Sequence, residues 1–168
     1  MNIPVLSITL FTPLLGALLV LLIPKAWTGF LKVVGVLFSL VALGLTSYVW
    51  WAAAGAGAAE MQLMEHRPWI PDLDLVYTLG VDGLSAPMIA LAGLLTALSL
   101  FYSAFTVKER IKEYFLLFLL LETGMLGVFM SLDMVLFYVF WEVGLVPMFL
   151  LIGIWGGERR EYAAIKFF

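Results

Sequence analysis

The sequence predicts an all-α, polytopic bundle of transmembrane helices. Of its 168 residues, 64% are hydrophobic and only 12% are charged, and the mean hydropathy is +1.08. Soluble domains are about half apolar and about a quarter charged, so an excess of this size indicates that lipid is the main solvent of the chain. Apolar runs of about 20 residues, each long enough to cross a bilayer, favour the same class.

Five such runs occupy 3–23, 30–51, 83–106, 113–131 and 133–155. The first has no basic n-region and no small-residue cleavage site, and it is longer than the core of a signal peptide, so we expect it to be a retained span. After the basic turn GGERREY, the residues AAIKFF read as the opening of a sixth helix. The prediction is five full spans and the start of a sixth, in a chain that reads as part of a longer protein.

The charges between the spans predict an orientation. The second loop, at about 52–82, holds five acidic residues and a single basic one, Arg67. The other eight of the nine basic residues lie in the first and third loops or after the fifth span: Lys25, Lys32, Lys108, Arg110, Lys112, Arg159, Arg160 and Lys166. The positive-inside rule puts those segments in the cytoplasm, which predicts an N-terminus on the outer, periplasmic side.

The loop at 52–82 is too polar to cross the membrane. Pro68 and Pro71 exclude a helix through PWIP. The alternation in DLDLVYTL predicts a short strand on the outer surface. Asp82 precedes the third span and is expected to accept hydrogen bonds from its free N–H groups. Within that span, small residues at helical spacing predict a packing face: Ala86, Ala90, Gly93 and Ala97.

Two spans carry an acid near their centre, Glu122 in the fourth and Glu142 in the fifth. Each lies ten residues from Leu132, the middle of the short turn between these spans. At about 1.5 Å of rise per residue, an antiparallel hairpin brings both acids to the same depth, about 15 Å from the turn. An ionised acid there costs at least about 2.5–3.5 kcal/mol, so the expected state is one shared proton or two bound protons.

Such a pair is suited to loading and unloading protons, and we predict proton translocation as its role. The alternative is structural, since a buried glutamate can simply hydrogen-bond a neighbouring helix. Pro147 supports the site because it frees the carbonyl of Val143, beside Glu142. Tyr138 lies one turn before Glu142 and either bonds it, contacts a water chain or packs.

Other chemistry is excluded by the composition. The chain has no cysteine and a single histidine, His66, so we predict no metal site. No catalytic constellation, cofactor-binding motif or nucleic-acid-binding pattern is present in the sequence. We therefore expect no redox centre in this chain.

Two segments resemble a known family. PWIPDLDLVYTLGVDGLSAPM, at 68–88, resembles the segment before the third helix of antiporter-like membrane subunits. Residues 119–168 are similar to chain M of the proton-pumping NADH–quinone oxidoreductase, the counterpart of mitochondrial subunit 4 of respiratory complex I. The resemblance is carried by VDGLS, FYVFWE, VPMFLLIGIWGG and AAIKFF. VDGLS and the helix-five acid recur in sister chain L and in cation/proton antiporters, whereas VPMFLLIGIWGG with its basic turn favours chain M.

The resemblance implies a fourteen-helix subunit of two inverted repeats, of which this chain is the N-terminal portion. Residues 1–110 are then a three-helix region with its outer loop, and 111–168 begin the proton-translocating module. Glu142 matches a helix-five glutamate that pairs, in the family, with a lysine on a broken helix seven. Glu122 matches an acid often found on helix four. Lys166, at the start of helix six, either anchors the helix at the interface or takes part in proton intake.

The implied function is proton translocation coupled to electron transfer from NADH to quinone, in which the chain is enzymatic only as a subunit of the translocase. FMN and iron–sulfur clusters are expected in partner subunits, chains L and N as membrane neighbours, and a bacterial inner membrane as the location. Three alternatives stay open: a multi-subunit cation/proton antiporter, a membrane-bound hydrogenase, or a non-conducting scaffold subunit. The coupling ion, its stoichiometry and the quinone type are left open by the sequence.

Overall fold

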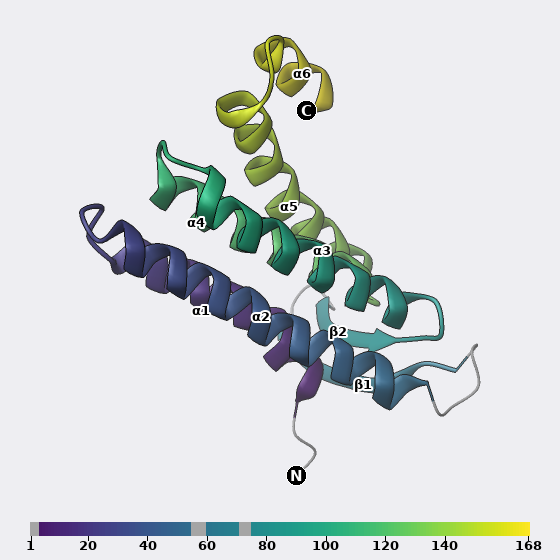
Figure 1. Ribbon diagram of the computed structural model, residues 1–168. Coiled ribbons are helices and arrows are strands. Elements are labelled where there is room, and N and C mark those ends of the chain that lie inside the picture. Colours follow the sequence, from purple (N-terminus) through teal and green to yellow (C-terminus); the bar gives the residue numbers. More distant parts are fainter. Residues whose placement is uncertain (1–3, 55–59, 71–74) are drawn as a thin grey trace.

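The computed structural model describes residues 4–54, 60–70 and 75–168 (Figure 1). This part of the chain forms helices and one small antiparallel sheet. The elements are α1 (Val5–Leu22), α2 (Thr28–Ala53), β1 (Gln62–Ile70), β2 (Leu75–Val81), α3 (Ser85–Thr106), α4 (Ile111–Met130), α5 (Met134–Trp155) and α6 (Arg160–Phe167).

The predicted spans are confirmed. Helices α1 to α5 are each long and apolar enough to cross a membrane, and each begins and ends within two residues of its predicted limit. The predicted opening of a sixth helix is α6, which begins at Arg160 and lies beyond the C-terminal end of α5 (Figure 1). The fold is therefore a polytopic helical bundle, as the composition indicated.

Two side chains define helix starts next to the outer surface. Asp82 Oδ1 accepts hydrogen bonds from the N–H groups of Leu84 at 3.0 Å and Ser85 at 2.7 Å, as predicted for the start of α3. The Ser85 N–H bond, above all, lowers the pKa of the Asp82 carboxyl. Asp133 caps α5 in the same way, by accepting from Val135 N and Leu136 N.

The outer loop contains a β-hairpin. β2 confirms the strand predicted from DLDLVYTL, except that 72–74 lie outside the described residues. β1 was not predicted, because Pro68 and Pro71 indicate only that no helix runs through PWIP. In a two-stranded sheet, however, one side of each strand is an edge, where a proline costs no ladder hydrogen bond. Pro68 pairs in register with Val76.

The buried apolar side chains form two clusters, one toward each end of the bundle. The hairpin-side cluster includes Leu6, Leu10, Val49, Ala53, Leu79, Val81, Ala86, Ile89, Ala92, Leu126, Met130, Leu136 and Phe140. The loop-side cluster, near the α1–α2 and α3–α4 connections, consists of Ala17, Val20, Leu31, Val34, Leu100, Phe115 and Leu119. Both clusters draw on α1 to α4, so these four helices form the body of the bundle.

The small-residue face of α3 packs as predicted. Ala86, Ala90 and Ala97 are buried there, together with Gly93. A methyl group added at Gly93 would lie 2.5 Å from Thr46 Oγ1 on α2. The stripe therefore allows the backbones of α2 and α3 to approach closely.

Glu65 connects the β-hairpin to α1 through hydrogen bonds to the start of that helix. The first residue before α1, Pro4, offers no side-chain cap. Glu65 on β1 takes that role: its carboxylate accepts from Leu6 N at 2.7 Å, from Ser7 N at 3.2 Å and from the Ser7 hydroxyl. Tyr77 on β2 shares the Ser7 hydroxyl at 2.9 Å, and burial raises the pKa of Tyr77. Local sequence gave no signal for this contact between distant residues.

Replacing Glu65 by alanine tests this remote cap. The free N–H groups at the start of α1 would lose their acceptor, which costs about 1 kcal/mol for an ordinary N-cap. We expect amide hydrogen exchange at Leu6 and Ser7 of the intact protein to become about fivefold faster. Glu60→Ala, at an exposed acid before β1, is the control and should leave that exchange unchanged. Equal exchange in wild type and Glu65→Ala would contradict the assignment.

Candidate functional site

Glu122 lies inside the bundle, on α4. Its side chain is 0% exposed. Neither carboxyl oxygen has a hydrogen-bond partner within the described residues. Burying a polar group without a partner reduces the stability of a protein, and more so at membrane depth. Packing alone therefore does not explain why a glutamate occupies this position.

The level of Glu122 follows from the two apolar clusters. On α4, Leu126 belongs to the hairpin-side cluster and Leu119 to the loop-side cluster. Both lie about one turn from Glu122 and share its side of the helix. Glu122 therefore lies between the two clusters along α4, on the side of the helix that faces both of them.

The other three helices of the bundle also change from one cluster to the other through buried polar residues. On α1 this residue is Thr12, between Leu10 and Ala17. We call the set the polar layer: Thr12, Ser39, Thr46, Thr96, Glu122 and Thr123, all of them buried. Its members lie between the two apolar clusters along each of the four helices.

The hydroxyl groups of the layer are largely used within their own helices. Thr12 donates to the carbonyl of Ile8 at 2.7 Å, and Thr123 to that of Leu119 at 2.9 Å. Ser39 and Thr46 make the same kind of bond, to the carbonyls of Val36 and Leu43. Their oxygen lone pairs remain able to accept a hydrogen bond from a neutral acid or from a water molecule.

Pro13 adds an acceptor at this level that sequence reasoning missed. It is buried in the middle of α1, next to Thr12. Because proline has no N–H, the carbonyl of Thr9 loses its usual intrahelical donor. The signal was present in the sequence, since a proline inside the first apolar run has the same effect that was considered for Pro147.

Glu142 lies on the opposite side of the α4–α5 hairpin from Glu122. It is exposed on α5, on a face that it shares with Tyr138, Val139 and Val146. Only 22% of the most apolar part of α5 is buried, against 44% in α4. α5 thus presents an uncovered face with an acid at its centre.

The contact between α4 and α5 is made by glycines. A methyl group added at Gly124 would lie 2.6 Å from the Cα of Gly144, so the two backbones touch there. Glu122 and Glu142 each lie two residues from this contact, displaced toward opposite ends of the bundle. At about 1.5 Å per residue the two acids differ in level by about 6 Å, whereas equal depth was predicted.

The two carboxyls do not hydrogen-bond one another, because the Glu122 oxygens have no partner in the described part of the chain. The structure therefore shows no direct contact through which the two acids would share one proton, and the other predicted state, two bound protons, stays a prediction. The difference arises from helix rotation: the rise argument fixes a level but not the direction in which each side chain points.

The three residues that were predicted to support the acids lie in different environments. Pro147 is buried within α5, which continues through it without interruption. Tyr138 is 60% exposed, on the face of α5 that also carries Glu142. Lys166 is exposed on α6, where its ammonium lies 5.8 Å from the centre of the Tyr162 ring. No group of three or more potential ligands that could hold a metal occurs among the residues described.

Known sequences that are similar to this chain carry names of one group of proteins, the quinone oxidoreductases. Residues 131–168 match the family model described as NADH:quinone oxidoreductase/Mrp antiporter, TM. NAD(P)H-quinone oxidoreductase chain 4 2 of Thermosynechococcus vestitus is 37% identical over 98% of this chain and 31% of its own length. NADH-quinone oxidoreductase subunit M of Rickettsia felis is 40% identical over 100% of this chain and 35% of its own length. The chain spans about a third of the length of the curated relatives it matches.

Solved structures agree with these relatives. A chain of respiratory complex I from Thermus thermophilus with bound NADH superposes with a TM-score of 0.76 at 28% identity, over 95% of this chain and 31% of that one. A chain of the archaeal membrane-bound sulfane sulfur reductase has a TM-score of 0.80 at 20% identity, over 98% of this chain and 33% of that one. The second similarity supports the fold alone.

Gly124→Ala tests the glycine contact that positions the two acids. The new methyl group has no space against the backbone of Gly144, so we expect a loss of about 1–3 kcal/mol of stability. Gly44→Ala on α2 is the matched control, because nothing lies within 4 Å of its added methyl group. There, the helix preference for alanine should stabilise by about 0.5–1 kcal/mol. Denaturant unfolding of the intact protein measures the change in unfolding free energy for each variant. Equal changes in the two variants would refute the close contact.

Proposed function

We propose that this chain, a relative along its whole length of subunit M and chain 4 of the NADH- and NAD(P)H-quinone oxidoreductases, takes part in proton translocation coupled to electron transfer from NADH to quinone. The observation that carries the proposal is Glu122, a fully buried carboxyl without a hydrogen-bond partner in a polar layer. A group of that kind contributes little to stability and is well suited to holding a proton at membrane depth.

The two acids have different roles in this proposal. Glu142 exchanges protons on the uncovered face of α5, where the rest of the protein would contact it. Its proton affinity follows the charge of a basic partner, and the resemblance to chain M suggests a lysine on a later helix. Glu122 holds a proton inside the bundle, with the polar layer as its surroundings. The α4–α5 contact keeps the two groups on opposite sides of one helix pair.

The supporting residues follow from the same arrangement. Tyr138 shares the exposed face of Glu142 and would contact water on that face. Pro147 leaves the carbonyl of Val143 free beside Glu142. We assign Lys166 to interfacial anchoring, because its ammonium lies against the Tyr162 ring on its own helix.

The chain is a multi-pass membrane protein, and its relatives belong to multi-subunit respiratory membrane complexes. We propose that it has no redox centre of its own, that FMN and iron–sulfur clusters reside in partner subunits, and that chains L and N are its membrane neighbours. The resemblance to bacterial chain M suggests a bacterial inner membrane, and the charge distribution supports an orientation with the hairpin and N-terminus on the periplasmic side. Residues 111–168 would then open the proton-translocating module, after a three-helix region at 1–110.

A second candidate is a subunit of a cation/proton antiporter, because the matching family description includes such antiporters. The fold and the acids would be unchanged, and only the driving reaction would differ. Proton uptake that requires NADH and not a sodium or potassium gradient would favour the oxidoreductase.

Glu142→Gln tests the exchange role. Without an ionisable group at this position, NADH-driven proton uptake by membrane vesicles should fall at least about tenfold per NADH oxidised, as expected for a lost proton-transfer group. Glu158→Gln, at an exposed acid in the α5–α6 turn, is the matched control and should pump normally. The amount of assembled complex is measured in parallel. Normal uptake in Glu142→Gln would refute the assignment.

Glu122→Met separates function from structure. Methionine fills a similar volume and has no polar group to bury, so we expect stability that is equal to or higher than that of wild type. Proton uptake should nevertheless fall, because no proton can be held at this position. A scaffold role predicts the reverse result, with lost assembly and normal uptake per assembled complex.

A further inference from the structure

A cavity of about 320 Å³ lies at the loop-side end of the bundle, between the α1–α2 and α3–α4 connections. Four basic side chains line it, and the only acid among its lining residues is Glu113. The basic residues are Lys25, Lys108, Arg110 and Lys112. The cavity is therefore strongly positive and separate from the polar layer.

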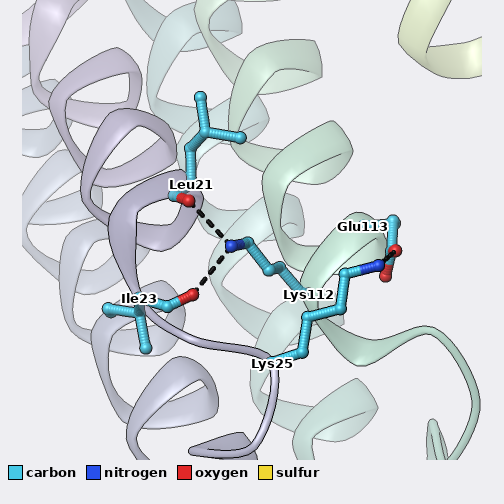
Figure 2. A network of polar contacts seen from close by, with 5 residues as sticks. All are labelled: Leu21, Ile23, Lys25, Lys112 and Glu113. Carbon is cyan, nitrogen blue, oxygen red and sulfur yellow. Dashed lines mark hydrogen bonds and ion pairs between the residues drawn. The ribbon is translucent and has the colours of Figure 1, made fainter.

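Two of the four cations are already engaged (Figure 2). Lys112 Nζ donates to the carbonyls of Leu21 and Ile23 at 2.7 Å each, at the C-terminal end of α1. Lys25 forms an ion pair with Glu113. These contacts hold the two connections together and form the walls of the cavity.

The other two cations form no ion pair within the described residues. Within the described residues, neither Lys108 nor Arg110 lies within 4.0 Å of an acidic oxygen. Glu109 stands between them in the sequence, but it does not line the cavity. Their two charges are thus available to an anion from outside the chain.

The backbone adds to this positive character. α2 begins at Thr28 and α4 at Ile111, so both helices start at the cavity. Neither start has a side-chain cap. Free N–H groups at helix starts carry partial positive charge and favour a phosphate.

The surface next to the cavity is apolar and faces outward. Leu22 is 78% exposed and Trp27 62% exposed, on either side of Lys25 along the chain. Phe30 and Val33 continue this surface along α2, and the Trp27 and Phe30 rings meet edge to face at 6.2 Å. A charged cavity beside an exposed aromatic and aliphatic surface matches a phosphate that carries acyl chains.

We propose that this cavity binds the phosphate of an anionic phospholipid, with Lys108 and Arg110 as its charged ligands and the acyl chains along the outer surface of α2. The proposal does not depend on proton translocation. It also fits the preference of basic segments for membrane surfaces that are rich in anionic lipid.

The test uses the intact complex in neutral detergent, with photoactivatable phosphatidylglycerol or phosphatidylcholine of identical acyl chains. We expect the first lipid to label the peptide around 22–33 at least about fivefold more than the second. Arg110→Asn should lower labelling by phosphatidylglycerol about fivefold, and Lys108→Gln is a second variant with the same expected loss. Asparagine suits position 110 because Arg110 has a φ of 50°, which asparagine adopts more readily than most residues.

Two variants serve as controls. Arg110→Lys keeps the charge and should keep most of the labelling. Arg159, the N-cap residue of α6, is a second arginine at a helix start of the same end, so Arg159→Asn should not change labelling of this peptide. Equal labelling by both lipids, or an equal loss in Arg159→Asn, would overturn the proposal. Competition by inorganic phosphate as strong as that by phosphatidylglycerol would also overturn it, in favour of a soluble anion.

Discussion

Helix α1 depends on side chains from other elements for the polar groups at both of its ends. At its start, the free N–H groups of Leu6 and Ser7 reach the Glu65 carboxylate on β1. At its end, the carbonyls of Leu21 and Ile23 accept from Lys112 on α4. Backbone groups at a membrane cannot be left without partners. The bundle satisfies this requirement by tertiary contact, which fixes the hairpin at one end and the basic loops at the other.

The same requirement gives Glu122 its significance. Four hydroxyl groups of the polar layer each donate a hydrogen bond to a carbonyl of their own helix. Thr12 and Thr123 are examples. The Glu122 carboxyl has no such bond, although it is equally deep. The close approach of Gly124 and Gly144 leaves no room for side chains between the two backbones at this point of the α4–α5 contact. The two acids are thereby kept on opposite sides of this helix pair, one enclosed and one open.

Features that depend on local sequence were predictable, and features that depend on distant contacts were not. Hydropathy located the spans, alternation located β2, and the position of Asp82 before an apolar run indicated its capping role. β1 was missed because Pro68 is tolerated only at the edge of a sheet, and the local sequence does not show that such an edge forms. The equal depth of Glu122 and Glu142 was wrong by about 6 Å. The turn at Leu132 was assumed to be symmetric, whereas the glycine contact sets the register.

The lysine that closes the end of α1 has a consequence for biosynthesis. Lys112 lies 89 and 91 residues after the two carbonyls that it binds. At about 5–20 residues per second, the ribosome needs at least several seconds to supply it after α1 has been made. During that interval the nascent α1 has to rely on headgroup water or on the insertion machinery for those carbonyls. The final position of the first helix is therefore set only when the fourth emerges.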